Sequence, residues 1–224
     1  MINADTDYVI QKATVNDVEF LADVIIGAEK SFTNNMGLAN LFDLSEDSVK
    51  ELIVAMLKED VDGCEFSVSS FFIAWYQDKP VGAVGGWPEG HYNGVSSNII
   101  KSNLINYVFP KESIIKAQER LGMIREMLQI ERPAGTYQIE YGFVDNEHRG
   151  KRITDRLMEA HQAFAKNLNS SIGLMQVSCF ETNQTSIKMH QKNGFQVVKR
   201  YVCDNEEIFK YLPHNVKVLL EKII

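Results

Sequence analysis

Three basic residues, Arg149, Lys151 and Arg152, stand close together in a chain that is acidic overall, with a net charge of −7. They follow a predicted strand at 136–144 and precede a predicted helix with apolar residues at spacings of three and four. The first N–H groups of a helix lack internal partners, and the helix dipole adds positive charge there. The pattern predicts a phosphate site, and the alternative is a basic, solvated helix start that binds nothing.

A second segment, NQTSIKMHQKNGF at 183–195, follows the basic segment VDNEHRGKRITDRLMEA after one further predicted strand. Together the two segments resemble the GNAT family of N-acetyltransferases. That family has R/Q-x-x-G-x-G/A where a helix begins, and later N-x-x-A-x-x-x-Y-x-K-x-G-F. The matching positions here are Val144, Arg149, Gly150, Asn183, Lys192, Gly194 and Phe195.

Arg152 and Thr154 replace the two glycines of the first family motif. Glycine at these positions lets a diphosphate approach the backbone closely. We expect larger side chains to be tolerated if they point away, because these positions are predicted to be helical and to need no positive φ. Arg152 then either contacts a phosphate through a charge-assisted hydrogen bond or blocks the site. The sequence leaves both alternatives open.

The resemblance implies that acetyl-coenzyme A is the co-substrate, with its diphosphate at the helix start and its pantetheine arm along the end of the preceding strand. The residues expected to hold it are Phe143, Val144, Arg149, Gly150, Lys151, Arg152, Ile153, Thr154, Asn183 and Lys192. A backbone N–H near Phe143 or Val144 is expected to polarise the thioester carbonyl. Asn183 either contacts coenzyme A or caps the helix that it starts.

Two side chains are candidates for proton transfer. Strand alternation places Gln138, Glu140, Gly142 and Val144 on one face, and a covered carboxylate at Glu140 suits a general base for the incoming ammonium. The alternative is an exposed or salt-bridged glutamate. His190 stands where the family has a tyrosine that protonates the leaving thiolate, and histidine can donate a proton near neutral pH. The alternative is a histidine that packs beside coenzyme A.

The order of predicted elements indicates how these residues are positioned. Strands are predicted at 8–13, 70–77, 80–87, 136–144, 173–180, 195–202 and 215–222, with helices beginning at Thr14, Ser45, Pro110, Ile153 and Thr185. This order predicts an α/β fold, with a mixed, mostly antiparallel sheet flanked by helices. We expect one GNAT-like domain over residues 1–224.

The segment 88–130 is longer than a typical connection between a hairpin and a strand. We expect residues 88–106 to be loop-like, and a helix to carry Ile114, Ala117, Leu121, Ile124 and Leu128 on one face. In the family's architecture this insert would lie over the acceptor side of the cleft. Its aromatic residues either shape an amine pocket or pack the insert onto the sheet: Trp87, Tyr92, Tyr107 and Phe109.

Composition narrows the functional classes. An acidic balance argues against nucleic acid as the main partner, because phosphate backbones require basic surfaces. Cys64, Cys179 and Cys203 form no CxxC pair, which suits a reducing compartment. No stretch approaches the ~18 apolar residues of a membrane span, no secretory signal is visible, and His148 and His161 have no partner at a metal-ligand spacing. We therefore expect a cytoplasmic protein without metal, nucleic acid or membrane as partner.

The leading prediction is an N-acetyltransferase, an acyltransferase that moves an acetyl group from acetyl-coenzyme A to a small-molecule or peptide amine. The amine would attack the thioester directly. The main alternative is a non-catalytic acyl-coenzyme A-binding or regulatory module of the same fold, and a further one is an enzyme for longer acyl chains. Dimers are common in the family, so the resemblance implies that a homodimer is one possible oligomeric state.

Overall fold

The computed structural model describes residues 8–125, 130–168 and 172–224. Its strands form one seven-stranded sheet in the order β1-β2-β3-β4-β5-β7-β6. Their bounds are β1 Tyr8–Lys12, β2 Phe71–Tyr76, β3 Lys79–Pro88, β4 Thr136–Val144, β5 Leu174–Phe180, β6 Gln196–Val202 and β7 Val216–Ile223. Only β4 and β5 pair in parallel, which confirms the predicted mixed, mostly antiparallel sheet.

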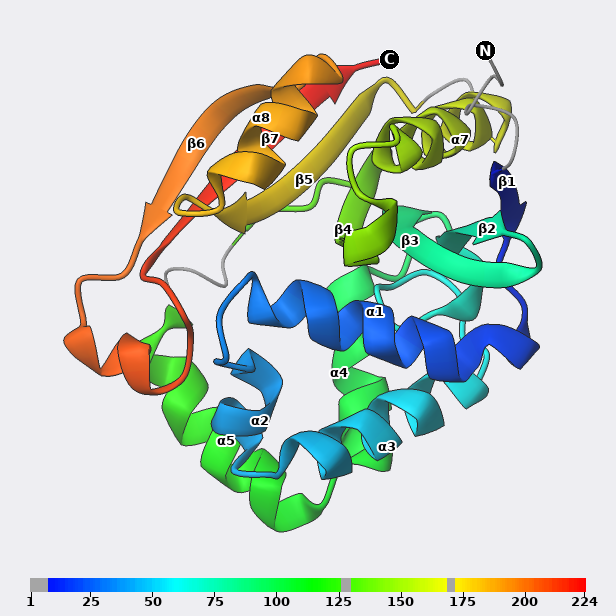
Figure 1. Ribbon diagram of the computed structural model, residues 1–224. Coiled ribbons are helices and arrows are strands. Elements are labelled where there is room, and N and C mark those ends of the chain that lie inside the picture. The colour runs from blue at the N-terminus through cyan, green and yellow to red at the C-terminus, as the bar shows by residue number, and fades with distance from the viewer. Residues whose placement is uncertain (1–7, 126–129, 169–171) are drawn as a thin grey trace.

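Helices cover both faces of the sheet (Figure 1). Their bounds are α1 Val18–Lys30, α2 Gly37–Phe42, α3 Glu46–Lys58, α4 Ser97–Val108, α5 Lys111–Met123, α7 Ile153–Leu168 and α8 Gln184–Lys192. Helices α1 to α5 share one apolar core with the sheet, and α7 and α8 share a second core on the other face. The chain is therefore a single α/β domain, as predicted.

Local capping chemistry explains where the first helices begin. The Thr14 backbone N–H donates to Asp17 Oδ2 at 2.8 Å, which completes a capping box ahead of α1. Ser45 Oγ accepts from the Ser48 N–H at 3.1 Å and caps α3. Both helix starts were predicted from these residues, because a cap involves only neighbours in the sequence.

The prediction that residues 88–106 form a loop was wrong, because α4 covers Ser97–Val108. This helix is rich in serine and asparagine, which are weak helix formers. Tertiary packing of its buried residues Ile100 and Leu104 holds it against the first core instead. The helix predicted after Pro110 is confirmed as α5, whereas Leu128 lies outside the described residues.

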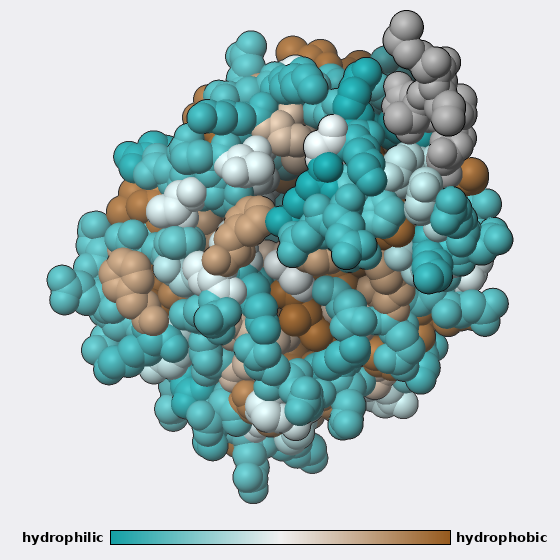
Figure 2. Space-filling model, viewed as in Figure 1, coloured by the Kyte–Doolittle hydropathy of each residue, from teal (hydrophilic) through white to brown (hydrophobic). Residues whose placement is uncertain are grey.

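The face of the molecule shown in Figure 2 is mostly hydrophilic, with apolar residues visible near its centre. None of the helices in the described ranges combines the length and the apolar character that crossing a membrane requires.

Candidate active site

Strands β4 and β5 run side by side only over their first halves. Thr136–Ile139 pairs with Leu174–Val177, whereas β5 remains paired with β7 as far as Phe180. In the described structure, the β5-facing edge of residues 140–144 therefore has no strand ladder. Backbone N–H and C=O groups require partners when they are covered. This divergence of β4 from β5, here called the β4–β5 split, leaves backbone groups for a ligand to pair with.

A bulge in β4 changes which side chains share a face. Tyr141 has a φ of +52°, and the pairing with β3 skips from Gly85–Glu140 to Ala83–Phe143. The prediction that Glu140 and Val144 lie on one face was therefore wrong. Val144 packs into the core beneath α7, whereas Phe143 packs against the core beneath α1. Strict alternation cannot anticipate an inserted residue.

The basic segment forms a turn at the start of α7. Arg149, Lys151 and Arg152 are all exposed, and the first helical hydrogen bond joins the Arg156 N–H to the Arg152 carbonyl at 3.2 Å. The N–H groups of residues 153–155 precede this bond, so they are the helix-start donors that an anion seeks. The predicted combination of exposed cations and free helix-start donors is present.

The expectation that Arg152 needs no positive φ was wrong. Its φ is +59°, in the left-handed region, and Gly150 before it has a φ of +76°. Glycine occupies this region without the Cβ penalty, whereas other residues incur about 1–2 kcal/mol. Arg152 thus adopts a backbone conformation that glycine would adopt without strain. Its side chain turns back to Asp155, with Arg152 Nε 3.3 Å from Asp155 Oδ2.

Asp155 is a charged residue of this turn that the sequence reasoning missed. It accepts from Asn193 Nδ2 at 3.0 Å and from Lys192 Nζ at 3.4 Å, in addition to Arg152. Burial raises the pKa of Asp155, but these three hydrogen-bond donors outweigh burial and lower it. Lys192 was predicted to contact the acetyl donor. It reaches the start of α7, where it neutralises the Asp155 carboxylate.

Arg149 lies at the end of the β4–β5 split. Its Nε donates to the Val144 carbonyl at 2.9 Å, and its guanidinium stacks over the rings of Phe32 and Phe143 at 5.3 and 5.8 Å. The structure thus brings together Arg149, Phe143 and Val144, three of the residues predicted to hold the co-substrate.

The residues of the second motif lie on α8 or at its two ends. Asn183 caps this helix, because its Oδ1 accepts from the Ser186 N–H at 3.1 Å, and its Nδ2 donates to Ser31 Oγ at 3.2 Å. His190 is buried, and its Nδ1 has no hydrogen-bond partner. Burial lowers the pKa of His190 to about 4, which leaves the imidazole neutral at pH 7. Its role as an acid stays a prediction.

A family model described as "Acetyltransferase (GNAT) family" matches residues 40–195. The chain belongs to the GNAT acetyltransferase family. It is accordingly an acyltransferase, of a family that transfers the acetyl group of acetyl-coenzyme A. A comparison with curated proteins found no match.

Solved structures share the GNAT fold at low sequence identity. An N-acetyltransferase from Staphylococcus aureus Mu50 is 15% identical, with a TM-score of 0.65, over 95% of this chain and 99% of that one. A polyamine N-acetyltransferase from Drosophila melanogaster, which catalyses the formation of N-acetylagmatine, is 17% identical, with a TM-score of 0.58, over 97% and 100%. A ribosomal-protein-alanine N-acetyltransferase from Brucella melitensis is 12% identical, with a TM-score of 0.54, over 96% and 99%.

The residues of this GNAT chain fit the co-substrate of the family. A diphosphate requires positive charge and free N–H groups, and the start of α7 supplies both beside the left-handed turn at Gly150 and Arg152. An extended amide chain requires unpaired strand edge, and residues 140–144 of β4 supply it. The carboxylate of Asp155 opposes an anion at the start of α7, but three hydrogen-bond donors already neutralise it.

Glu140, the predicted base, is salt-bridged in a buried network of the GNAT domain. Its Oε2 accepts from Arg132 Nη2 at 3.0 Å, and Arg132 also contacts Glu65, which is 2% exposed. Arg132 Nη1 also donates to Ser97 Oγ at 3.3 Å, so the network ties α4 of the insert to β4. The salt-bridged alternative is thus observed, and the role as a base stays a prediction.

Glu29 and Tyr141 are further polar residues at the site that the sequence reasoning missed. Tyr141 OH donates to Glu29 Oε1 at 3.3 Å. A signal was available in the sequence, because Glu29 continues the apolar stripe of Ala22 and Ile25 on α1. A charged residue on a buried stripe is uncommon unless it has a partner or a function.

Cys179 lies on β5, on the opposite side of the split. Burial raises the pKa of its thiol to about 11, against the hydrogen bond to Ser186 and the charge of Lys217, which lower it. The thiol is therefore protonated at pH 7 and is a weak nucleophile. This state disfavours a route through an acetylated cysteine.

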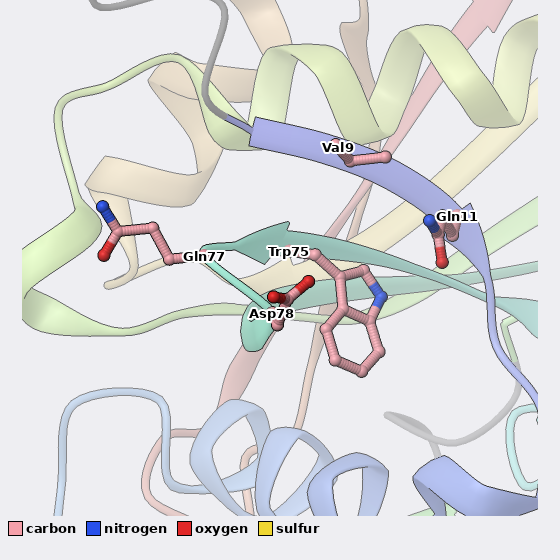
Figure 3. A pocket seen from close by; sticks show the side chains of 5 residues that line it. All are labelled: Val9, Gln11, Trp75, Gln77 and Asp78. Carbon is pink, nitrogen blue, oxygen red and sulfur yellow. The ribbon is translucent and has the colours of Figure 1, made fainter.

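A cavity of about 300 Å³ lies away from these residues, at the β1–β2 edge of the sheet. Figure 3 shows its lining, which is Val9, Gln11, Trp75, Gln77 and Asp78. None of these five residues was predicted to act in the site. Among the residues that the structure places, no three His, Cys, Asp or Glu side chains come together in a way that would hold a metal ion.

The left-handed turn at Arg152 leads to a test of stability. We expect Arg152→Gly to be more stable than Arg152→Ala by about 0.5–1 kcal/mol, because both lose the contact with Asp155 but only alanine keeps a Cβ at positive φ. Urea unfolding measures the difference. At the neighbouring exposed residue, Lys151→Gly is expected to be less stable than Lys151→Ala. The same order at both positions would contradict the proposed role of backbone conformation.

Proposed function

We propose that the protein transfers an acetyl group from acetyl-coenzyme A to a primary amine, which attacks the thioester directly. The observation that supports this most is the continuity of β4. The strand leads from the acidic side chains beside its bulge, along an unpaired edge, to the basic turn at the start of α7. Such a track can align an acyl donor with an amine, and alignment alone lowers a barrier by several kcal/mol.

In this proposal, the turn binds the donor's diphosphate through the N–H groups of Ile153 and Thr154 and through the charges of Arg149, Lys151 and Arg152. The thioester supplies an activated acetyl group. A backbone N–H near Phe143 or Val144 polarises its carbonyl. Asn183 fixes the start of α8 through its cap, and Gly150 permits the tight turn.

We also propose that the insert between β3 and β4 covers the acceptor side. The contacts of Arg132 with Ser97 and Glu140 support this placement, because they join the insert to β4 beside the split. The acidic side chains Glu29 and Glu140 favour a cationic acceptor. The names of two solved structures mention a polyamine and a ribosomal-protein alanine, and these define the classes of amine to test first.

The experiment combines binding with turnover. We expect acetyl-coenzyme A to bind in calorimetry, and thiol release to depend on an added amine from a set of agmatine, spermidine and an alanine-initiated peptide. Mass spectrometry should find the N-acetylated amine and no acetyl group on Cys179. Binding without turnover on any amine would favour a non-catalytic module, and an acetyl adduct on Cys179 would overturn direct attack.

A further inference from the structure

Glu29 lies where α1 crosses the β4–β5 split. Two residues before it, Gly27 is in close contact with β4, since a Cβ there would lie 2.6 Å from Phe143 Cδ2. Two residues after it, Ser31 Oγ accepts from Asn183 Nδ2, at the start of the helix that follows β5. The chain around Glu29 is thus fixed to both sides of the split, and Glu29 lies between the two fixed points.

The surroundings of the Glu29 carboxylate differ from those of an ordinary surface glutamate. Tyr141, the bulge residue of β4, donates its OH to Oε1 at 3.3 Å, and the start of α2 lies against Oε2, since a Cβ on Gly37 would be 3.0 Å from it. Lys217 on β7 and Glu140 on β4 also face it. Burial raises the pKa of Glu29, while Lys217, Tyr141 and Leu38 lower it and Glu140 raises it further. The net effect brings the carboxylate closer to the pKa range of a base that works near neutral pH.

Glu29 is better placed for proton transfer than Glu140. The carboxylate of Glu140 forms an ion pair with Arg132, which is itself shared with the buried Glu65. The hydrogen-bond donor that the structure shows for Glu29 is the neutral phenol of Tyr141. Among the described residues, a proton taken up by Glu29 breaks no salt bridge and gives up only the longer-range attraction of Lys217, whereas protonation of Glu140 would remove the partner of a buried guanidinium.

We propose that Glu29 is the general base that takes the proton from the acceptor ammonium, held in position by Tyr141. The inference rests on the proposed function. The ammonium gives one proton to the carboxylate, and the nitrogen lone pair then forms the C–N bond at the thioester carbonyl carbon. The C–S bond breaks with its electron pair on sulfur. The second proton lost by the nitrogen goes to this thiolate, so that the products are an amide, a thiol and a protonated Glu29, which releases its proton to solvent.

The test is the pH profile of kcat/KM with acetyl-coenzyme A and the best amine of the set above. We expect Glu29→Gln to lose about 100-fold or more at pH 7, with a smaller loss as the pH approaches the pKa of the amine, where free base needs no catalyst. Glu19→Gln, the same change on the exposed face of α1, should leave the profile unchanged. Calorimetry with coenzyme A should give wild-type affinity for both variants.

Tyr141→Phe gives an independent readout that a structural role would not produce. The hydrogen bond from Tyr141 lowers the pKa of Glu29, so its removal should move the acidic limb of the profile to higher pH. An unchanged limb in Tyr141→Phe, or an unchanged rate in Glu29→Gln, overturns the assignment of Glu29. Loss of the acidic limb in Glu140→Gln alone would give the role to Glu140. Absence of amine-dependent thiol release from the unsubstituted protein overturns the proposed function itself, and this inference with it.

Discussion

Replacing Arg132 with methionine is expected to lower the free energy of unfolding at pH 7 by about 3–5 kcal/mol. Arg132 lies between two carboxylates, with Nη1 3.4 Å from Glu65 Oε2 and Nη2 3.0 Å from Glu140 Oε2. Glu65 is 2% exposed and cannot turn to solvent, so without Arg132 it depends on Lys101 alone, 2.6 Å away, and Glu140 loses its ion pair. Methionine also loses the contact of the guanidinium with the ring of Trp87. Urea unfolding monitored by circular dichroism measures the loss.

The cost of Arg132→Met should depend on pH. Burial alone would raise the pKa of Glu65, but Lys101 and Arg132 outweigh it and lower the pKa to about 2. A depressed carboxyl pKa contributes stability above the unfolded-state value near 4.5, and this contribution is lost as the pH falls towards 2. Without Arg132 the pKa of Glu65 rises, so the carboxylate of the folded variant takes up its proton at a higher pH than in the wild type. The difference between wild type and variant should therefore shrink between pH 7 and pH 4.

A matched control is available at the surface. Lys116→Met removes a cation paired with Asp43, where both side chains are about half exposed. We expect a loss below about 1 kcal/mol, because water screens such pairs. An Arg132→Met loss as small as this control, or one independent of pH, would contradict the view that the network ties the insert to β4.

Local patterns predicted the parts of the fold that depend on neighbouring residues. Thr14 and Asp17 identified the start of the first helix, and the spacing after Ile153 identified α7. Contacts between distant parts of the chain were missed. Arg132 meets Glu65 across 67 residues, and Tyr141 meets Glu29 across 112. Such contacts leave no periodic pattern in the sequence. The sequence therefore predicted the basic turn before α7, but not the contacts of Glu29 and Arg132.

Two backbone features were missed for a related reason. The bulge at Tyr141 and the left-handed Arg152 both place a non-glycine residue at positive φ, where local preference argues against it. Surrounding structure maintains them, through the β3 pairing around the bulge and through the contacts of the α7 start. Such conflicts between local preference and fold are expected near functional sites. Here both lie along β4 or at the turn that follows it.

Reversing two charges at the start of α7, by Arg149→Glu with Lys151→Glu, is expected to weaken acetyl-coenzyme A binding roughly 100-fold or more. Charge-assisted hydrogen bonds to phosphate contribute about 1.5–3 kcal/mol each, and 1.4 kcal/mol corresponds to tenfold in affinity. Both side chains are exposed, so they can attract the diphosphate without a large desolvation cost for either charge. Calorimetry measures the affinity, and the variant should also lose much of its salt dependence.

The control is Lys58→Glu with Lys111→Glu, which makes the same change in net charge at exposed sites in α3 and α5, on the other side of the sheet from α7. It should bind acetyl-coenzyme A within about twofold of wild type, because charges beyond a Debye length of about 8–10 Å are screened. Arg149 also donates a hydrogen bond to the Val144 carbonyl at 2.9 Å, so its replacement could change the backbone as well as the charge. Lys151→Glu alone changes the charge and leaves this hydrogen bond in place. An equal loss of affinity in the control and in the α7 variant would mean that only the net charge of the protein matters. Unchanged affinity in Lys151→Glu and in the double variant would move the diphosphate away from this turn, and the proposed donor site with it.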